Sequence, residues 1–325
     1  MPQIDSRILA YLSKNKDGYS SGQAMAKGLG LTRAAVWKAV ESLRGAGYVI
    51  ESSPAKGYRL AEVPDLLGAR EITAGLDTDT FGRVVYALDQ VDSTNTFASR
   101  LAADGAKEGT LVISDSQSAG RGRLGRNWSS PPGMNVYMSL ILRPGIPPVD
   151  APLITLAASV ALAKSVNGLY GIDARIKWPN DLLIDGRKLA GMLTEMNAEP
   201  ERVRHIVLGV GVDVNMPKRA FPADIRDAST SVMVELGRKV NRAELVRGFL
   251  FELEQVYHMF LSGGRAQVLD EWRGLSCTLG RNVRIHAVSG YTEGLAVNVD
   301  DTGALVLKHP DGRLVTVTGG DVGFI

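Results

Sequence analysis

The chain of 325 residues has a single cysteine, Cys277, which excludes an intramolecular disulfide and any all-cysteine metal site. It also lacks a long hydrophobic run. The most apolar stretch, 153–163, is followed by Lys164 and is too short to cross a bilayer core of about 30 Å as a helix. The first residues interleave Asp5 and Arg7 with apolar residues and lack the core of a signal peptide. These absences predict a cytoplasmic protein with no membrane partner.

Net charge is also small, at +2, but it is distributed unevenly. The first 60 residues contain nine Lys and Arg against four Asp and Glu, so the remainder of the chain carries a slight negative excess. A basic head on a mildly acidic body suggests that a polyanion binds the head, although a solvated surface gives the same count.

Apolar spacing in the head predicts three short helices and a hairpin. Residues 4–13 have one apolar face, Ser20 and Ser21 can cap a second helix, and Thr32 can cap a third. Two short strands follow at 48–51 and 57–60. This order resembles a winged helix-turn-helix domain.

The segment from Gly22 to Glu41 resembles the two-helix unit of that domain, with Gly28 and Gly30 in the tight turn. The resemblance implies that DNA is contacted by three basic residues, Arg33, Lys38 and Lys56. Two alternatives stay open: a protein-binding or vestigial module, and a Trp37 that packs against the next domain.

From residue 66 the pattern changes to longer alternating strands with helices between them, which predicts a mixed α/β sheet. Candidate strands lie at 83–91, 110–115, 135–142, 175–177, 182–185, 187–196 and 204–214, and candidate helices at 95–103, 152–167 and 242–260. After about residue 275 short strands separated by glycines predict a small barrel. We expect an α+β protein with domains at 1–63, 66–273 and 274–325.

The most unusual segment is the arginine loop, residues 120–126, with the sequence GRGRLGR. Its three glycines allow close approach of the backbone to a ligand, and its three arginines supply guanidinium groups that can donate two hydrogen bonds to one anion. Phosphate is therefore the expected ligand. The loop is neither a Walker loop nor a dinucleotide fingerprint. Taken alone, a flexible contact with nucleic acid is an equally good interpretation.

Three further segments carry polar groups that a small ligand needs. Residues 92–95 (DSTN) gather hydroxyl and amide groups at the predicted start of a helix. Residues 177–181 (KWPND) put a lysine at a strand end, and residues 188–191 (KLAG) follow on the next strand. Residues 209–215 (GVGVDVN) let a strand lie flush against a flat group.

In this order and spacing, DSTN, SQSAGRGRLGRNW, KWPNDLLIDGRKLAG and GVGVDVN resemble the biotin protein ligase family. The similarity covers about 86–215 motif by motif, and the winged head makes the whole chain similar to bifunctional members that also repress transcription. It implies a central domain like class II synthetases, an SH3-like C-terminal β domain, and biotin and ATP as substrates. ATP-dependent, AMP-forming transfer of biotin to a lysine of biotin carboxyl carrier protein is the implied reaction.

The resemblance implies a biotin site formed by eight residues: Ser93, Thr94, Asn95, Gln117, Arg121, Gly122, Arg123 and Lys177. Lys177, Arg121 and Arg123 are the implied catalytic residues, with Lys177 bridging the biotin carboxylate and the α-phosphate. Lys188 is more simply explained by a surface salt bridge. Asp181 is a possible contributor to the chemistry, but a turn-stabilising role explains it more simply.

The implied nucleotide contacts are Gly209, Gly211, Asp213 and Asn215. Asp213 departs from the family pattern, which has asparagine there, and a carboxylate cannot donate to an adenine nitrogen as an amide can. The chemistry itself brings two anions together, so arginines and a lysine suffice. The metal ligands stay unknown, although Mg²⁺ is expected.

Operator DNA and a homodimer of the adenylate-bound protein complete the expected partners. Three alternatives remain: a monofunctional ligase with a vestigial head, a repressor that senses a ligand without catalysis, and a lipoate or octanoate transferase. A lipoate or octanoate transferase shares this architecture in outline but gives no reason for the arginine loop.

Overall fold

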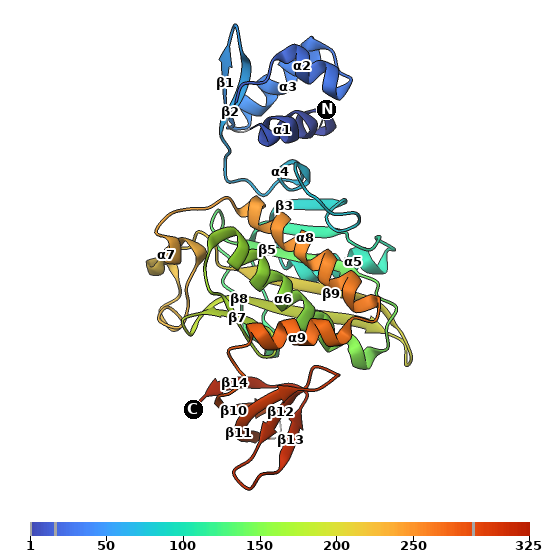
Figure 1. Cartoon of the computed structure of the whole chain (residues 1–325), viewed down its shortest axis with the longest axis vertical. Helices are drawn as coiled ribbons and strands as arrows, with labels where there is room; N and C mark the ends of the chain where they lie inside the picture. The colour runs from blue at the N-terminus through green and yellow to red at the C-terminus, as the bar shows by residue number, and fades with distance from the viewer. Residues whose placement is uncertain (1, 16–17, 288–289) are drawn as a thin grey trace. The chain divides into compact units, whose positions relative to one another are not determined.

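The computed structural model describes residues 2–15, 18–287 and 290–325. The chain separates into two compact units (Figure 1). One comprises Met1–Asp77 together with Asn241–Arg247, and the other comprises Thr78–Val240 together with Gly248–Ile325. The division into domains at 1–63, 66–273 and 274–325 stays a proposal.

The first unit contains the winged helix-turn-helix that the head predicted. Its elements are α1 (Pro2–Lys14), α2 (Gly22–Leu29), α3 (Arg33–Gly45), β1 (Val49–Ser53) and β2 (Gly57–Glu62). Ser21 and Thr32 cap α2 and α3, each accepting a hydrogen bond from a backbone amide three residues on. Gly30 ends α2 in the left-handed conformation, with φ of 64°. The predicted caps therefore define the turn between the two helices.

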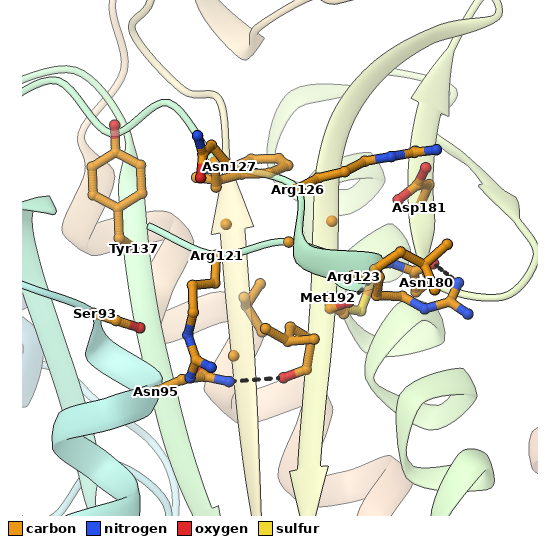
Figure 2. Close-up of a pocket in the computed structure, with 18 of the residues that line it drawn as sticks. Ser93, Asn95, Arg121, Arg123, Arg126, Asn127, Tyr137, Asn180, Asp181 and Met192 are labelled. Carbon is orange, nitrogen blue, oxygen red and sulfur yellow. Dashed lines mark hydrogen bonds between the residues drawn. The ribbon is translucent and has the colours of Figure 1, made fainter. Parts of the chain in front are cut away.

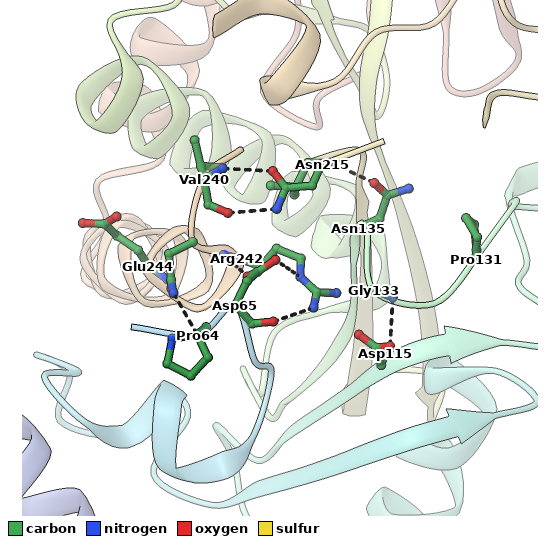
Figure 3. A network of polar contacts seen from close by, with 12 residues as sticks. Pro64, Asp65, Asp115, Pro131, Gly133, Asn135, Asn215, Val240, Arg242 and Glu244 are labelled. Atoms are coloured by element: carbon green, nitrogen blue, oxygen red, sulfur yellow. Dashed lines mark hydrogen bonds and ion pairs between the residues drawn. The ribbon is translucent and has the colours of Figure 1, made fainter. Parts of the chain in front are cut away.

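A distant segment completes this unit. The short helix α4 (Ala69–Thr73) and the first turns of α8 (Arg242–Leu261) both belong to it. Arg242 is 3% exposed, and its Nε lies 2.9 Å from Asp65 Oδ2 (Figure 3). Local sequence patterns did not predict that residues 241–247 pack with the head, because the pairing spans more than half of the chain.

The second unit is built on a seven-stranded mixed sheet with the order β3-β4-β5-β9-β8-β7-β6. Only β3 and β4 are parallel; the other neighbours are antiparallel. In sheet order the strands are Val85–Val91, Leu111–Gln117, Val136–Leu142, Val203–Val212, Arg187–Ala198, Asp181–Ile184 and Arg175–Lys177. The predicted mixed sheet is confirmed, with each boundary within a few residues of its expected place.

The helices α5 (Thr94–Ala103), α6 (Ala151–Tyr170) and α9 (Arg265–Leu275) contact this sheet (Figure 1). The rest of α8 belongs to the same unit. A further short helix, α7 (Val232–Leu236), lies in the connection after β9. Neither α7 nor α9 was predicted, and both have few core-facing positions: one buried residue in α7 and three in α9.

The prediction that the apolar stretch of α6 is too short to span a bilayer is wrong on length. With its preceding turn the helix runs over Pro148–Tyr170, 23 residues whose most apolar 18-residue window has a mean hydropathy of 1.5, long and apolar enough for a span. However, 78% of its most apolar window is buried within the protein. Its hydrophobicity is therefore explained by its position in the core of the second unit.

The C-terminal part is all β, as predicted. Its strands are β10 (Asn282–Ala287), β11 (Gly290–Val299), β12 (Leu305–Lys308), β13 (Leu314–Val317) and β14 (Asp321–Phe324). They form an antiparallel sheet with the order β13-β12-β11-β10-β14. An antiparallel β domain is therefore established, and its closure into an SH3-like barrel stays a prediction.

Candidate ligand-binding site

A cavity of about 260 Å³ lies in the second unit, between the arginine loop and the strands β8 and β9. Nine of the residues expected to bind biotin or nucleotide line it: Ser93, Thr94, Asn95, Gln117, Arg121, Gly122, Arg123, Gly209 and Gly211. Three of the predicted motifs, which are far apart in sequence, therefore meet at one place.

One end of the cavity is a preorganised polar cluster at the start of α5. Ser93 caps the helix, and the backbone amide of Thr94 donates to Gln117 Oε1 at 2.9 Å. Asn95 Nδ2 donates to Glu195 Oε2 at 2.8 Å, while Asn95 Oδ1 accepts from Ser139 Oγ at 2.6 Å. These bonds fix which way each amide points. Ser139 and Glu195 were missed because each sits inside an ordinary strand.

The arginine loop closes on itself as a small hairpin above the cavity. Gly122 N donates to Arg126 O at 2.7 Å, and Trp128 N donates to Gly120 O at 2.9 Å. A Cβ at Gly120 would lie 2.5 Å from the Trp128 carbonyl oxygen, so only glycine fits there. Leu124 adopts a positive φ of 56° at the tip. The glycines of the loop therefore allow the tight turns of this hairpin.

Each arginine of the loop has a different partner. Arg121 Nη2 lies 2.9 Å from Glu195 Oε2, and Arg126 Nη2 lies 2.6 Å from Asp321 Oδ2. Arg123 Nη1 donates to Asn180 Oδ1 at 2.8 Å (Figure 2). Burial raises the pKa of Asp321, but the hydrogen bond and charge of Arg126 outweigh it and lower that pKa overall. Burial lowers the pKa of Arg123.

The lysine at the cavity is Lys188 and not Lys177. Lys188 Nζ lies 2.7 Å from Asp181 Oδ1 and 5.4 Å from the centroid of the Trp128 ring, and both lysine and aspartate line the cavity. Lys177 is not among the lining residues; its Nζ lies 5.6 Å from the Phe324 ring centroid. Lys177 pairs with Asp181 where β6 and β7 meet, so it lies beside the cavity without lining it.

The glycines of the motifs make room for side chains of the cavity wall. A Cβ at Gly209 would lie 2.1 Å from Asn95 Oδ1, and one at Gly211 would lie 2.6 Å from the Trp128 ring. A Cβ at Gly191 on β8 would lie 3.2 Å from the same ring. Strand β9 therefore packs closely against Asn95 at the polar end of the cavity and against the flat ring of Trp128.

Asp213 and Asn215 lie beyond the cavity and have structural partners. Asp213 Oδ1 accepts from Asn135 Nδ2 at 2.7 Å, and burial raises the pKa of Asp213 well above its usual value, with Lys188 opposing. The Asn215 amide binds the backbone of Val240 at 2.8 and 3.0 Å (Figure 3). Neither side chain is among the residues that line the cavity.

Within residues 2–15, 18–287 and 290–325, no three His, Cys, Asp or Glu side chains are grouped closely enough to hold a metal ion.

In the first unit, the three basic residues predicted for DNA binding, Arg33, Lys38 and Lys56, are exposed. Trp37, on the same helix, is 55% exposed. A basic, accessible helix face is therefore present on the winged helix-turn-helix.

Three family models match the chain. The Biotin/lipoate A/B protein ligase family matches residues 87–213, an HTH domain matches residues 5–59, and the Biotin protein ligase C terminal domain matches residues 278–324. The ligase match contains the polar cluster, the arginine loop and Lys188, so the matched segment is the one that forms the cavity.

Curated relatives match nearly the whole chain. A bifunctional ligase/repressor BirA from Bacillus spizizenii is 39% identical over 94% of both chains, and one from Escherichia coli is 32% identical over 98% of this chain and 96% of its own. A solved biotin protein ligase from Aquifex aeolicus, in complex with biotin and ATP, has a TM-score of 0.65 at 24% identity. It covers 75% of this chain and 99% of its own, and shows that the fold is shared.

Proposed function

We propose, from the premise that this chain belongs to the biotin protein ligase family, that it joins biotin to AMP and passes the biotin to a lysine of biotin carboxyl carrier protein. Membership rests on relatives that are 39% and 32% identical and that the chain covers over 94% and 96% of their length. The cytoplasm is the proposed location, in keeping with a single cysteine.

One observation carries the proposal: neutral hydrogen-bonding groups and several cationic side chains line the same cavity. Ser93, Thr94, Asn95 and Gln117 present hydroxyl and amide groups that suit the ureido ring of biotin. Arg121, Arg123 and Lys188 line the same cavity and suit a carboxylate facing a phosphate. A ligand with one polar neutral end and one anionic end fits this distribution.

The first step needs neutralisation and alignment of two anions. A carboxylate oxygen of biotin bonds to the α-phosphorus of ATP as the bond from that phosphorus to the β-phosphate oxygen breaks, and pyrophosphate leaves. Lys188 is proposed to take the role that the resemblance gave to Lys177, because its ammonium is the one at the cavity. Preorganised cations stabilise the charge that develops on the phosphate.

In the second step the amine of the acceptor lysine attacks the acyl carbon of biotinyl-AMP, an amide bond forms, and AMP leaves. Asp181 is ion-paired with Lys188 at the cavity, which makes it a candidate to receive the amine proton. Trp128 offers a flat face for the nucleotide beside Gly211. Asp213 and Asn215 instead bind Asn135 and Val240 and are not proposed to touch the nucleotide. Mg²⁺ is proposed to enter with the phosphates of ATP, as part of that substrate.

The winged helix-turn-helix supports a second function, repression of transcription by an adenylate-bound homodimer. Relatives over nearly the full length are named as ligase/repressors, and the exposed Arg33, Lys38 and Lys56 provide phosphate or base contacts. Two heads are needed to bind two half-sites of an operator. Protection of operator DNA only when biotin and ATP are both present tests this; no protection would leave a ligase with an idle head.

Biotin-dependent exchange of labelled pyrophosphate into ATP tests the first step directly. Exchange that requires biotin and prefers ATP to GTP is expected. If exchange is absent, adenylation is not the reaction of this cavity. If GTP serves equally well, the proposed nucleotide specificity is wrong.

A further inference from the structure

The chain just before α2 pairs with the wing, the hairpin of β1 and β2 at residues 49–62 (Figure 1). Ser20 N donates to Tyr58 O at 2.8 Å, and Tyr58 N donates to Ser20 O at 2.9 Å. A Cβ at Gly57 would lie 2.2 Å from Ser20 O, so the two segments approach this closely only because residue 57 is glycine. The backbone before α2 is therefore joined to β2 at a defined position.

Tyr19, the residue before this bridge, lies against side chains of the wing. Its ring centroid is 5.9 Å from Lys56 Nζ and 5.4 Å from Arg59 Cζ. Its hydroxyl donates to Glu51 Oε2 at 2.7 Å. Glu51 lies on β1, Arg59 lies on β2 and Lys56 lies in the turn that joins them. One half-buried tyrosine therefore contacts both strands of the wing and its turn.

The two basic residues on this ring differ in their charge balance. Arg59 Nη2 lies 2.8 Å from Glu51 Oε2, and hydrogen bonds from Tyr19 and Arg59 lower the pKa of that carboxyl, so Arg59 has a charged partner at neutral pH. Lys56 is exposed, and no ion pair joins it to a carboxylate in the part of the chain that the structure describes. The charge of Lys56 therefore stays available to an anion from outside the protein.

Contact with an aromatic face suits a lysine that binds phosphate. An ammonium over a ring keeps its N–H donors accessible, while the flexible four-carbon stem loses part of its freedom before the anion arrives. The backbone of DNA offers a row of phosphates, and contacts with them fix the position of a DNA-binding domain without reading its sequence. A single exposed ammonium fits this partner, because the same unit carries the exposed Arg33 and Lys38.

We propose that Tyr19 is a positioning residue for DNA, which holds the wing against the start of α2 and directs Lys56 toward a backbone phosphate. The wing then contributes one phosphate contact, from Lys56, whereas Arg59 serves the structure of the wing through Glu51. The inference rests on the proposed DNA-binding function of the head, and it separates a residue that touches DNA from one that acts through it.

The test measures the affinity of the whole protein for a short DNA duplex of mixed sequence by fluorescence anisotropy, with biotin and ATP present and at several salt concentrations. Such a duplex suffices because phosphate contacts do not depend on sequence. Tyr19→Leu removes the ring and the hydroxyl, Tyr19→Phe removes only the hydroxyl, and Lys56→Gln removes the charge. The matched control is Tyr291→Leu, because Tyr291 is 64% exposed in the second unit and its ring centroid lies 5.1 Å from Arg284 Cζ. Thermal unfolding shows whether each variant is folded.

Tyr19→Leu weakens DNA binding by about two- to five-fold, which is the effect of losing one exposed contact between a cation and a ring. Tyr19→Phe stays within about two-fold of wild type, because the ring beneath Lys56 is kept. Lys56→Gln lowers the slope of log affinity against log salt concentration by about one counterion. In the Lys56→Gln background Tyr19→Leu has no further effect, as expected for a residue that acts through Lys56. Tyr291→Leu changes neither affinity nor slope.

Equal weakening by Tyr19→Leu with and without Lys56 overturns the proposal, because a structural defect of the head lowers affinity in both backgrounds. Unchanged affinity of Tyr19→Leu also overturns it, and Tyr19→Phe that binds as weakly as Tyr19→Leu assigns the effect to the bond with Glu51 and not to the ring. An unchanged salt slope in Lys56→Gln removes the phosphate contact, and this result holds even if Tyr19→Leu does not fold, because Lys56 lies in an exposed turn. A wild-type protein that binds no duplex at any salt concentration sinks the DNA-binding function itself.

Discussion

Replacing Lys188 with methionine removes the ammonium at the cavity and keeps a side chain of similar length. Lys188 Nζ lies 2.7 Å from Asp181 Oδ1, and the lysine lines the cavity together with Arg121 and Arg123. Adenylation brings a carboxylate onto a phosphate, so the loss of one cation from the cavity raises the barrier of that step. Lys177→Met is the matched comparison, because its ammonium lies near Phe324 and outside the cavity lining.

The expected loss follows from the role of a preorganised charge. Removing one group that stabilises transition-state charge typically lowers kcat by about 10²- to 10³-fold, or roughly 3–4 kcal/mol. A structural cost is also expected, because Asp181 has a side chain only 17% exposed and loses its cation. An unpaired buried acceptor costs about 1–3 kcal/mol of stability. Lys188→Met combined with Asp181→Asn restores part of that stability without restoring activity.

Biotin-dependent pyrophosphate exchange separates the two lysines. Lys188→Met loses exchange by about two to three orders of magnitude, and Lys177→Met changes it by less than about five-fold. Thermal unfolding of each variant shows whether the protein is folded under the assay conditions. If Lys177→Met abolishes exchange while Lys188→Met remains active, the catalytic lysine is Lys177, as the resemblance implied, and the assignment to Lys188 is wrong.

Three further outcomes are expected. Because burial raises the pKa of Asp213, the ionised form is disfavoured by folding and stability falls as the pH rises through that pKa. Asp213→Asn therefore unfolds at a higher temperature than wild type at about pH 8, with a smaller difference at about pH 5; a difference that grows toward acid contradicts this. Gly209→Ala puts a Cβ 2.1 Å from Asn95 Oδ1, and such overpacking costs about 1–3 kcal/mol, so biotin affinity measured by calorimetry drops by about ten-fold or more. An unaltered affinity would show that Asn95 does not touch biotin. Arg33→Ala and Lys38→Ala weaken operator binding and reduce its salt dependence by about one counterion each, with pyrophosphate exchange unchanged. Equal operator affinity at all salt concentrations would place the DNA contact elsewhere.

Local chemistry made much of the fold predictable. Ser21 and Thr32 are found as the caps of α2 and α3, because a hydroxyl at that position satisfies an amide that the helix leaves open. The strands of the central sheet appear where the alternation of apolar residues placed them. Most residues predicted for the biotin site line one cavity, because the motifs sit at strand ends and at a helix start.

The features of the site that local sequence patterns did not predict depend on contacts between distant segments of the chain. Lys177 and Lys188 lie in one continuous motif, and local patterns do not tell which of the two lines the cavity. Ser139 and Glu195 carry no local signal, since each occupies a normal strand position and is recognised only by its contacts in the folded protein, including those with Asn95. Asp213 follows the last residue of β9, accepts a hydrogen bond from the buried Asn135 and does not line the cavity.

Transfer of biotin to an acceptor lysine is the central claim, and intact-mass analysis of a purified apo carrier domain tests it most directly. Incubated with this protein, biotin and ATP, the carrier should gain the mass of one biotinyl group on one lysine, and it should gain nothing when ATP is omitted. A carrier whose mass stays unchanged in the complete mixture would contradict the ligase function.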